Sequence, residues 1–185
     1  MGINYKRKLF HASFGTFLLI LSYYVDFKYF KLFLFFLFLG MCIFELLRLK
    51  LEKYLPMKFF WKPLLKADES KRLTDAWFYL LGINFSVFFV STLGFRLILS
   101  VLSYADPVAA ILGHHFGKTR PFGNKSIEGS FFFFLASLII GLILLKSFSL
   151  KLIFFCLLAS AIEFFTKRDN LWLPVGLTIF WKVAW

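Results

Sequence analysis

The sequence predicts an all-α integral membrane protein: a bundle of six or seven transmembrane helices with the N-terminus in the cytoplasm. Three observations carry this prediction. Of the 185 residues, 60% are hydrophobic and 29 are phenylalanine, which suits lipid rather than water. At least six apolar runs approach or reach the length of about 20 residues that a spanning helix needs. The lysines and arginines fall mostly in alternate connections. We expect one polytopic domain over residues 1–185.

The apolar runs predict spans at 10–25, 29–48, 74–93, 95–113, 129–146, 148–165 and 171–185. The last run is short and holds Pro174, so it either tilts, thins the bilayer or only dips into it. The basic N-terminus followed by an apolar run resembles a signal peptide. No small-residue cleavage site follows, so we expect a retained anchor. The two cysteines lie in apolar runs and predict packed thiols, not a disulfide framework.

The orientation follows from the charges. With seven spans, sixteen of the 22 Lys and Arg side chains fall on one side and six on the other. The positive-inside rule places the sixteen in the cytoplasm, in a cell membrane. Attraction to anionic lipid headgroups explains a basic face by itself, so we expect no nucleic-acid partner. The oligomeric state stays open, with a homo-oligomer among the alternatives.

Topology does not explain the acidic residues, because carboxylates contribute little to it. Nine of the ten Asp and Glu side chains nevertheless fall on or near the basic side, and only Asp26 does not. Glu45, Asp106 and Glu163 lie within apolar segments, where an ionisable group is costly and indicates a functional site by default. Acids and bases gathered at one face predict a site for a metal and a phosphate.

The longest connection is residues 50–72. Its stretch KFFWK, residues 58–62, alternates aromatic side chains with lysines. This pattern is typical of a segment in the headgroup region. It serves either as a floor or lid of the site or as a plain interfacial anchor.

The stretch Asp106-Pro107 interrupts an apolar run. Proline lacks a backbone N–H, so a helix breaks, kinks or starts there. Asp106 is then either an N-cap inside a broken helix or a functional carboxylate. As a functional group it holds magnesium, which commonly takes one or two carboxylates plus substrate phosphates, or it orients the attacking hydroxyl.

GHHFGKT, residues 113–119, follows. It resembles a phosphate-binding P-loop, but it has three residues between its glycines instead of four and no preceding strand. We therefore reject the P-loop fold. Gly113 and Gly117 could still let the backbone approach a phosphate, and Lys118 supplies charge. His114 and His115 point apart on a helix, which favours interface or phosphate contacts over zinc.

NKSIEGS, residues 124–130, places Lys125 and Ser126 at the start of the next span, where free backbone N–H groups favour anions. Glu128 is either a first-turn acid or a metal ligand. Further candidates come from other segments: Arg7, Lys8 and His11 before the first span, Glu45 and Arg48 as an expected salt bridge three residues apart on one helix, Glu163, and Asp169 with Asn170, which could also cap the last helix.

These residues carry a resemblance to a known family. KRKLFHASFG, FELLR, ADPVAAILGHHFGK, NKSIEGS and Glu163 followed by DNLWLP stand in the order and spacing of the dolichol kinase, phytol kinase and CTP-dependent diacylglycerol kinase family. The resemblance covers residues 6–174. Asp-Pro-x-Ala-Ala with Gly-Lys, and Lys-Ser-x-Glu-Gly-Ser, are its specific parts. The chain lacks the extra spans of long dolichol kinases, which leaves the substrate open.

The resemblance implies transfer of the terminal phosphate of CTP to a lipid alcohol (a polyprenol, phytol or diacylglycerol) with Mg²⁺ or another divalent cation. Asp106, Lys118 and Lys125 are then the catalytic candidates. The expected nucleotide contacts are Arg7, Lys8, Gly113, Gly117, Lys118, Lys125, Ser126 and Asn170, and the expected metal ligands are Asp106, Glu163 and Asp169.

Other functions stay open. Short proteins of this kind resemble phosphatidate cytidylyltransferases loosely, but the long signature of those enzymes is missing here. A transporter would carry charges along a path across the bilayer, whereas these gather at one face. A non-catalytic assembly factor would not need acids, lysines and glycines together.

Overall fold

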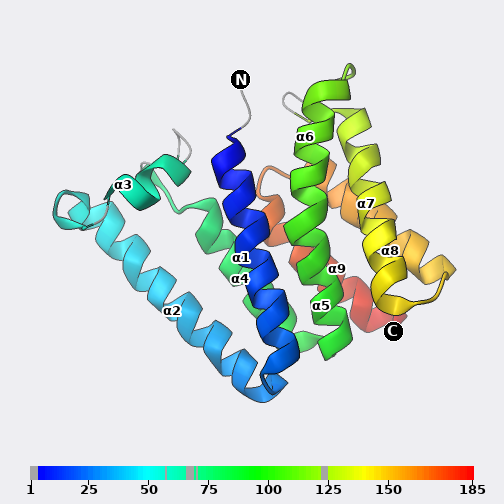
Figure 1. Ribbon diagram of the computed structural model, residues 1–185, viewed down its shortest axis with the longest axis horizontal. Coiled ribbons are helices and arrows are strands. Elements are labelled where there is room, and N and C mark those ends of the chain that lie inside the picture. Colours follow the sequence, from blue (N-terminus) through cyan, green and yellow to red (C-terminus); the bar gives the residue numbers. More distant parts are fainter. Residues whose placement is uncertain (1–3, 57, 66–68, 70, 122–124) are drawn as a thin grey trace.

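The computed structural model describes residues 4–56, 58–65, 69, 71–121 and 125–185 (Figure 1). The predicted segment 50–72 therefore lies partly outside the described residues. The described residues form an all-helical fold, as predicted. Its elements are α1 (Tyr5–Tyr24), α2 (Phe27–Leu51), the 3-10 turn η1 (Glu52–Tyr54), α3 (Lys58–Trp61), the 3-10 turn η2 (Lys62–Leu64), α4 (Asp75–Phe89), α5 (Thr92–Ser100), the π segment η4 (Val101–Ala105), α6 (Asp106–Phe116), α7 (Ile127–Leu145), α8 (Leu150–Phe165) and α9 (Asp169–Ala184).

Short polar side chains set where most of these helices begin. Each accepts a hydrogen bond from a backbone N–H of the first turn, which the helix itself leaves without a partner. The capping residues are Asn4 for α1, Asp26 for α2, Thr74 for α4, Ser91 for α5, Ser126 for α7 and Ser149 for α8. Most residues within the helices are apolar, and the turns from α1 to α2, from α4 to α5, from α7 to α8 and from α8 to α9 are only a few residues long.

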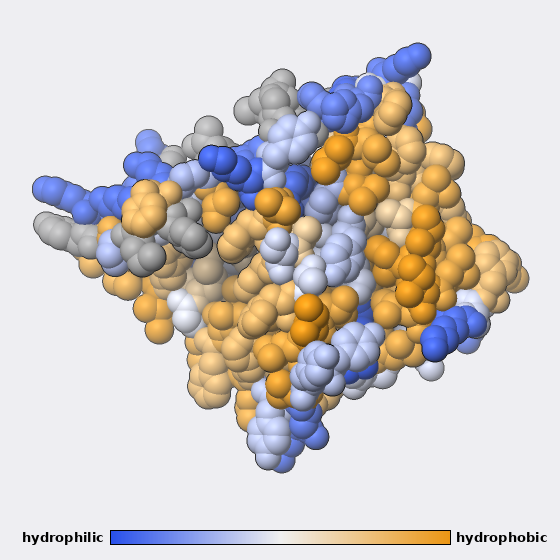
Figure 2. Space-filling view, in the orientation of Figure 1, coloured by the Kyte–Doolittle hydropathy of each residue, from blue (hydrophilic) through white to orange (hydrophobic). Residues whose placement is uncertain are grey.

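Three helices of the described chain are long and apolar enough to cross a membrane: Phe27–Leu51, the continuous Thr92–Phe116 and Ile127–Leu145. Within an 18-residue apolar stretch of each helix, 61% of Thr92–Phe116 is buried inside the protein, against 17% of Phe27–Leu51 and 22% of Ile127–Leu145. Thr92–Phe116 is therefore the central helix, and the other two present their apolar faces outward, where lipid would cover them. Figure 2 shows an apolar belt on this face, with hydrophilic residues along its upper edge and others at its lower edge.

The central helix does not break at Asp106-Pro107. Its turns widen into the π segment Val101–Ala105 directly before these residues, and the helix then continues to Phe116. A proline ring clashes with the carbonyl four residues earlier in an α-helix, and the wider turn relieves this clash. Asp106 has helical backbone angles and caps nothing with its side chain. The interpretation of Asp106 as an N-cap is therefore wrong.

Successive helices run in opposite directions, so the end of one helix and the beginning of the next lie on the same side of the bundle. One such side, the polar end, holds the beginnings of α1, α4, α7 and α9 and the ends of α2, α6 and α8 (Figure 1). The beginning of a helix carries a partial positive charge and its end a partial negative charge. Charged side chains placed here can reach across several helices.

Candidate functional site

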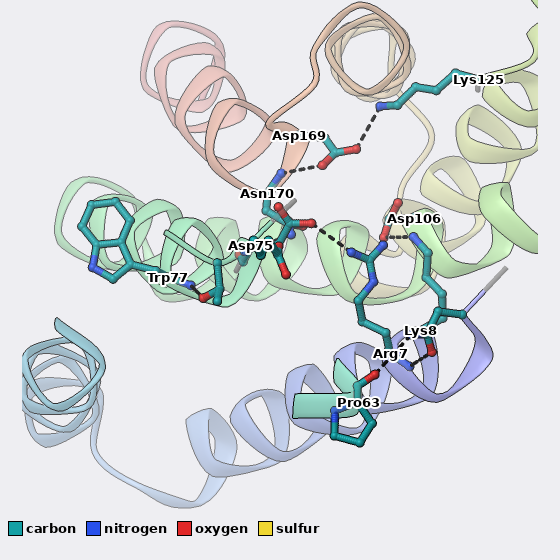
Figure 3. A network of polar contacts seen from close by, with 12 residues as sticks. Arg7, Lys8, Pro63, Asp75, Trp77, Asp106, Lys125, Asp169 and Asn170 are labelled. Carbon is teal, nitrogen blue, oxygen red and sulfur yellow. Dashed lines mark hydrogen bonds and ion pairs between the residues drawn. The ribbon is translucent and has the colours of Figure 1, made fainter. Parts of the chain in front are cut away.

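The candidate site is a cluster of seven charged side chains at the polar end, of which Figure 3 labels Arg7, Lys8, Asp75, Asp106, Lys125 and Asp169. We call it the polar cluster. It comprises Arg7, Lys8, Asp75, Asp106, Lys125, Glu163 and Asp169, which come from α1, α4, α6, α8, α9 and the residue before Ser126. Six of these seven residues are candidates from the sequence, and the exception is Asp75.

The pair of Lys8 and Asp106 joins α1 to the central helix. The Lys8 Nζ lies 2.7 Å from Asp106 Oδ2, and both side chains are 15% exposed. The two residues are 98 positions apart in the sequence. Because this carboxylate lies within a helix that would cross the membrane, a cation beside it offsets part of the cost of its burial.

His11 lies one turn below Lys8 on α1, and its ring stacks edge-on against Tyr79 at a centroid distance of 4.8 Å. Its Nε2 lies 3.0 Å from the carbonyl oxygen of Leu102 in the π segment. In a π turn that carbonyl would accept from the N–H of residue 107, which is proline and has none. A carbonyl only accepts, so Nε2–H donates. His11 therefore supplies the missing donor and supports the π segment.

Arg7 pairs with Asp75, a residue that the sequence analysis did not single out. Arg7 Nη1 lies 3.1 Å from Asp75 Oδ2, and each side chain is a little over a quarter exposed. Asp75 follows the cap Thr74, so it looks like an ordinary first-turn acid of α4. Its backbone carbonyl also accepts a hydrogen bond from Asn170 Nδ2 at 3.4 Å. Asn170 thus connects α9 to α4 at the edge of the cluster.

Lys125 joins the loop before α7 to α8 and α9. Its Nζ lies 3.0 Å from Glu163 Oε1 and 2.9 Å from Asp169 Oδ2. It also donates to the backbone carbonyls of Glu163 and Thr166, at the end of α8. The last carbonyls of a helix lack partners within it, so a lysine here stabilises the helix end. Asp169 accepts from the backbone N–H of Asn170 through its other oxygen, at 2.9 Å.

Lys125 is protonated at neutral pH. Burial by itself lowers the pKa of this ammonium group, but the nearby carboxylates of Asp169 and Glu163 outweigh burial and raise the pKa above its usual value of 10.5. Lys125 is therefore a permanent positive charge beside two acids.

The charges of the polar cluster nearly balance. Its four carboxylates face three basic side chains, which leaves one negative charge in excess. Each of the four carboxylates is paired with a basic side chain. Within the described residues, no group of three or more His, Cys, Asp and Glu side chains could hold a metal ion by itself. Magnesium, however, commonly needs only one or two protein carboxylates when phosphates and water complete its shell. A divalent cation at these carboxylates stays a prediction, and it would have to arrive with a phosphate that completes its shell.

Glu45 and Arg48 form the salt bridge that the sequence predicts. Arg48 Nη2 lies 2.6 Å from Glu45 Oε2, and both side chains are only 1% exposed. The guanidinium also donates to the carbonyls of Glu69 and Arg72, while Glu45 accepts from the backbone and hydroxyl of Thr74. We call Glu45, Arg48 and Thr74 the α2 clasp. It fastens the segment before α4 onto the end of α2.

The glycine stretch packs two helices together. A Cβ on Gly113 would lie 2.9 Å from the Cα of Gly129 and 3.1 Å from Ser126 Oγ, so α6 and α7 touch through backbone. The carbonyl of Gly113 accepts from the N–H of Gly117 and from Arg120. This packing explains Gly113 without a nucleotide. The nucleotide contacts predicted for Gly113, Gly117 and Ser126 stay predictions.

Glu128 and Lys118 lie in the same region. Glu128 accepts the backbone N–H of Thr119 at 3.2 Å, so this carboxylate orders the loop after α6. Lys118, His114 and His115 are exposed. Among the described residues, no hydrogen bond or ion pair connects the side chains of these three to the polar cluster.

Comparison with protein-family models, with curated proteins and with solved structures gives no match to this chain.

Proposed function

We propose that the protein is a membrane-embedded kinase that transfers the γ-phosphate of a nucleotide, CTP by resemblance, to a lipid alcohol at the cytoplasmic interface. One observation supports this most: seven charged side chains from six segments converge at one end of a largely apolar bundle. At such a place a water-soluble phosphate donor and a membrane-bound hydroxyl can meet.

The proposal includes the membrane topology. Each of the seven predicted spans overlaps a helix of the described residues, and three of these helices are long and apolar enough to cross a membrane. We propose that all seven cross or enter the bilayer with the N-terminus inside. Cysteine accessibility in intact cells tests this, with a probe cysteine replacing Arg120, in a variant whose Cys42 and Cys156 are replaced by alanine. Labelling from outside would overturn both the topology and the site.

The exchange of ionic partners explains how a nearly neutral cluster could bind a nucleotide. A lysine is a point charge on a flexible stem, so Lys8 and Lys125 can swing from their carboxylates to phosphate oxygens. Asp106 and Asp169 would then be available to a divalent cation, which neutralises charge on phosphate oxygens when bound. The excess of one negative charge would become an excess of one positive charge, which suits a triphosphate.

The reaction then follows the general logic of phosphoryl transfer, in which positioning and electrostatics carry the catalysis. A bond forms between the alcohol oxygen and the γ-phosphorus, and the bond from that phosphorus to the bridging oxygen breaks. Asp106 either accepts the hydroxyl proton or holds the metal, and a nucleoside diphosphate leaves. Lys8, Lys125 and Arg7 stabilise the charge on the phosphates.

The position of the label separates this reaction from nucleotidyl transfer to phosphatidate. Purified protein receives magnesium and CTP labelled at either the γ- or the α-phosphate. Diacylglycerol, phytol, geranylgeraniol, a polyprenol and phosphatidate serve in turn as acceptors. We expect the γ-label in an alcohol and the α-label in CDP. Entry of the α-label into phosphatidate would replace the kinase proposal with a cytidylyltransferase.

A further inference from the structure

A shallow groove runs between α7 and α8, next to the polar cluster. It has a volume of about 220 Å³ and is lined by Ile127, Ser130, Leu157, Ser160, Ala161 and Phe164. These residues belong to the first turn of α7 and to residues 157–164 of α8, so the groove lies near the polar end of two apolar helices. Ile127 and Leu157 are each about half exposed, at 51% and 49%. Their apolar surfaces border the groove.

Two serine hydroxyls form the polar part of this lining. Ser130 Oγ donates to Glu163 Oε2 at 3.2 Å, and Ser160 Oγ donates to the backbone carbonyl of Ser130 at 2.8 Å. Glu163 in turn pairs with Lys125 of the polar cluster. The groove is thus connected to the candidate site by a short chain of hydrogen bonds.

The direction of these hydrogen bonds restricts what the groove can recognise. A serine hydroxyl has one hydrogen to donate and two lone pairs that accept. Both hydrogens are already donated inside the protein, so each serine can only accept from an occupant. A lipid with a free O–H group meets this requirement. An ester or an ionised phosphate does not, because neither has a hydrogen to donate.

We propose that this groove binds the lipid alcohol by its hydroxyl end, with Ser130 and Ser160 accepting from the O–H and one hydrocarbon chain lying against Ile127, Leu157 and Phe164. The groove is smaller than sites that enclose a drug-sized molecule, which reach about 300–1,000 Å³, so it holds only the hydroxyl end of the lipid and the first part of one chain. In diacylglycerol two ester-linked chains branch next to the hydroxyl, whereas a prenol carries one chain. A prenol or polyprenol therefore fits better than diacylglycerol. This inference rests on the proposed function for the reaction, but the binding itself does not depend on it.

The test uses the full chain in nanodiscs and a photoreactive analogue of geranylgeraniol with a diazirine close to the hydroxyl. Mass spectrometry locates the labelled residues. Unlabelled geranylgeraniol, geranylgeranyl acetate and dioleoylglycerol compete with the probe. We expect labelling of residues 157–164. The alcohol should compete at a concentration about tenfold lower than its acetate, since the acetate cannot donate the hydrogen bond.

Two variants add a matched comparison. Ala161→Trp fills the groove from an exposed position on α8, and Val183→Trp adds similar bulk on α9 at a residue 85% exposed that does not line the groove. We expect Ala161→Trp to reduce labelling and to raise the KM for geranylgeraniol by about tenfold, on the scale of losing one or two buried apolar contacts. Val183→Trp should change neither.

The outcomes separate the two proposals. Labelling of the groove without γ-phosphate transfer supports the groove and overturns the kinase. Transfer of the γ-phosphate with labelling elsewhere overturns the groove and keeps the kinase. If geranylgeranyl acetate competes as well as geranylgeraniol, the groove does not recognise the hydroxyl. If dioleoylglycerol competes as well as geranylgeraniol, the groove does not prefer a lipid with a single chain. The competition needs only the wild-type protein, so it stands even if Ala161→Trp fails to fold.

Discussion

The α2 clasp and the polar cluster lie at the same end of the bundle, and both hold buried charges, yet they are built differently. In the clasp an arginine and a glutamate are 1% exposed, and within the described part of the chain they bind each other, Thr74 and backbone. In the cluster the paired side chains of Lys8 and Asp106 are 15% exposed, and Lys125 is 26% exposed. The clasp uses a rigid guanidinium fork, whereas the cluster relies mostly on flexible ammonium groups.

This difference separates two uses of an ion pair. A fully buried pair whose hydrogen bonds are made inside the protein is not open to a ligand, so it stabilises one local structure. A pair of single-point contacts near solvent can exchange partners. The burial of a charge in a membrane helix therefore does not identify a catalytic residue by itself.

The largest expected effect concerns stability and the clasp. Glu45→Gln leaves Arg48 buried without its counter-charge, which should lower the free energy of unfolding by about 3–5 kcal/mol. Glu52→Gln is the matched control, because the pair of Glu52 and Lys62 is exposed and 3.5 Å apart. It should change stability by at most about 1 kcal/mol. Unfolding in detergent measures both, and equal effects would contradict the structural role of the clasp.

The next effect concerns activity and the cluster. Asp106→Asn keeps the shape of the side chain but removes its charge, so phosphate transfer should fall at least about a hundredfold while the protein stays folded. Asp26→Asn is the control. Asp26 caps α2 at the opposite end, and asparagine caps a helix equally well. Near-normal turnover of Asp106→Asn, measured with the γ-labelled donor, would reduce Asp106 to a partner of Lys8.

A smaller effect is expected at Lys125. Lys125→Ala removes a charge that we place on the nucleotide phosphates, so the KM for the nucleotide should rise on the order of tenfold to a hundredfold. Lys28→Ala, at the other end of the bundle, should leave it unchanged. Lys125→Ala also removes the donor to the last carbonyls of α8. A loss of stability with an unchanged KM for the nucleotide would show that Lys125 has a purely structural role.

The raised pKa of Lys125 adds a pH criterion. Its pairing with Asp169 and Glu163 is fully present below the usual lysine pKa of 10.5 and is lost only as the pH rises past the higher folded-state value. The contribution of Lys125 to nucleotide KM should therefore stay constant between about pH 7 and pH 9.5. If the affinity for the nucleotide declines within that pH range in the wild-type protein but not in Lys125→Ala, Lys125 loses its charge there, and the raised pKa would be wrong.

The smallest effect is expected at Lys118. Its side chain is exposed and, among the described residues, makes no ion pair. An exposed charge contributes at most about 1 kcal/mol, so Lys118→Ala should raise the nucleotide KM by no more than about fivefold. If Lys118→Ala lowered phosphate transfer as much as Asp106→Asn does, Lys118 would have to reach the polar cluster when the nucleotide binds.

The sequence predicts the helices well because apolar runs and capping residues are local signals. The Glu45–Arg48 pair is equally local, since its members are three residues apart on one helix. Asp75 was missed because its partner Arg7 is 68 residues away, and a first-turn acid carries no sign of such a contact. The π segment was missed for a different reason. Asp106-Pro107 indicates an interrupted helix. The helix continues partly because His11, which is 91 residues from Leu102 in the sequence, hydrogen-bonds the Leu102 carbonyl.

The π segment also fixes an angular relation along the central helix. A π turn amounts to one extra residue within an α-helix, and each α-helical residue advances the side-chain direction by about 100°. Because the wide turn takes up that extra residue, the helix keeps its phase on both sides of Val101–Ala105 and Asp106 faces Lys8. Deleting one residue from Val101–Ala105 would therefore leave the direction of Asp106 nearly unchanged, but it would restore the clash of the Pro107 ring with the preceding turn. Deleting one residue from the regular α turns of Thr92–Ser100 would instead rotate Asp106 by about 100° relative to the packed face of α5 and separate the acid from its lysine.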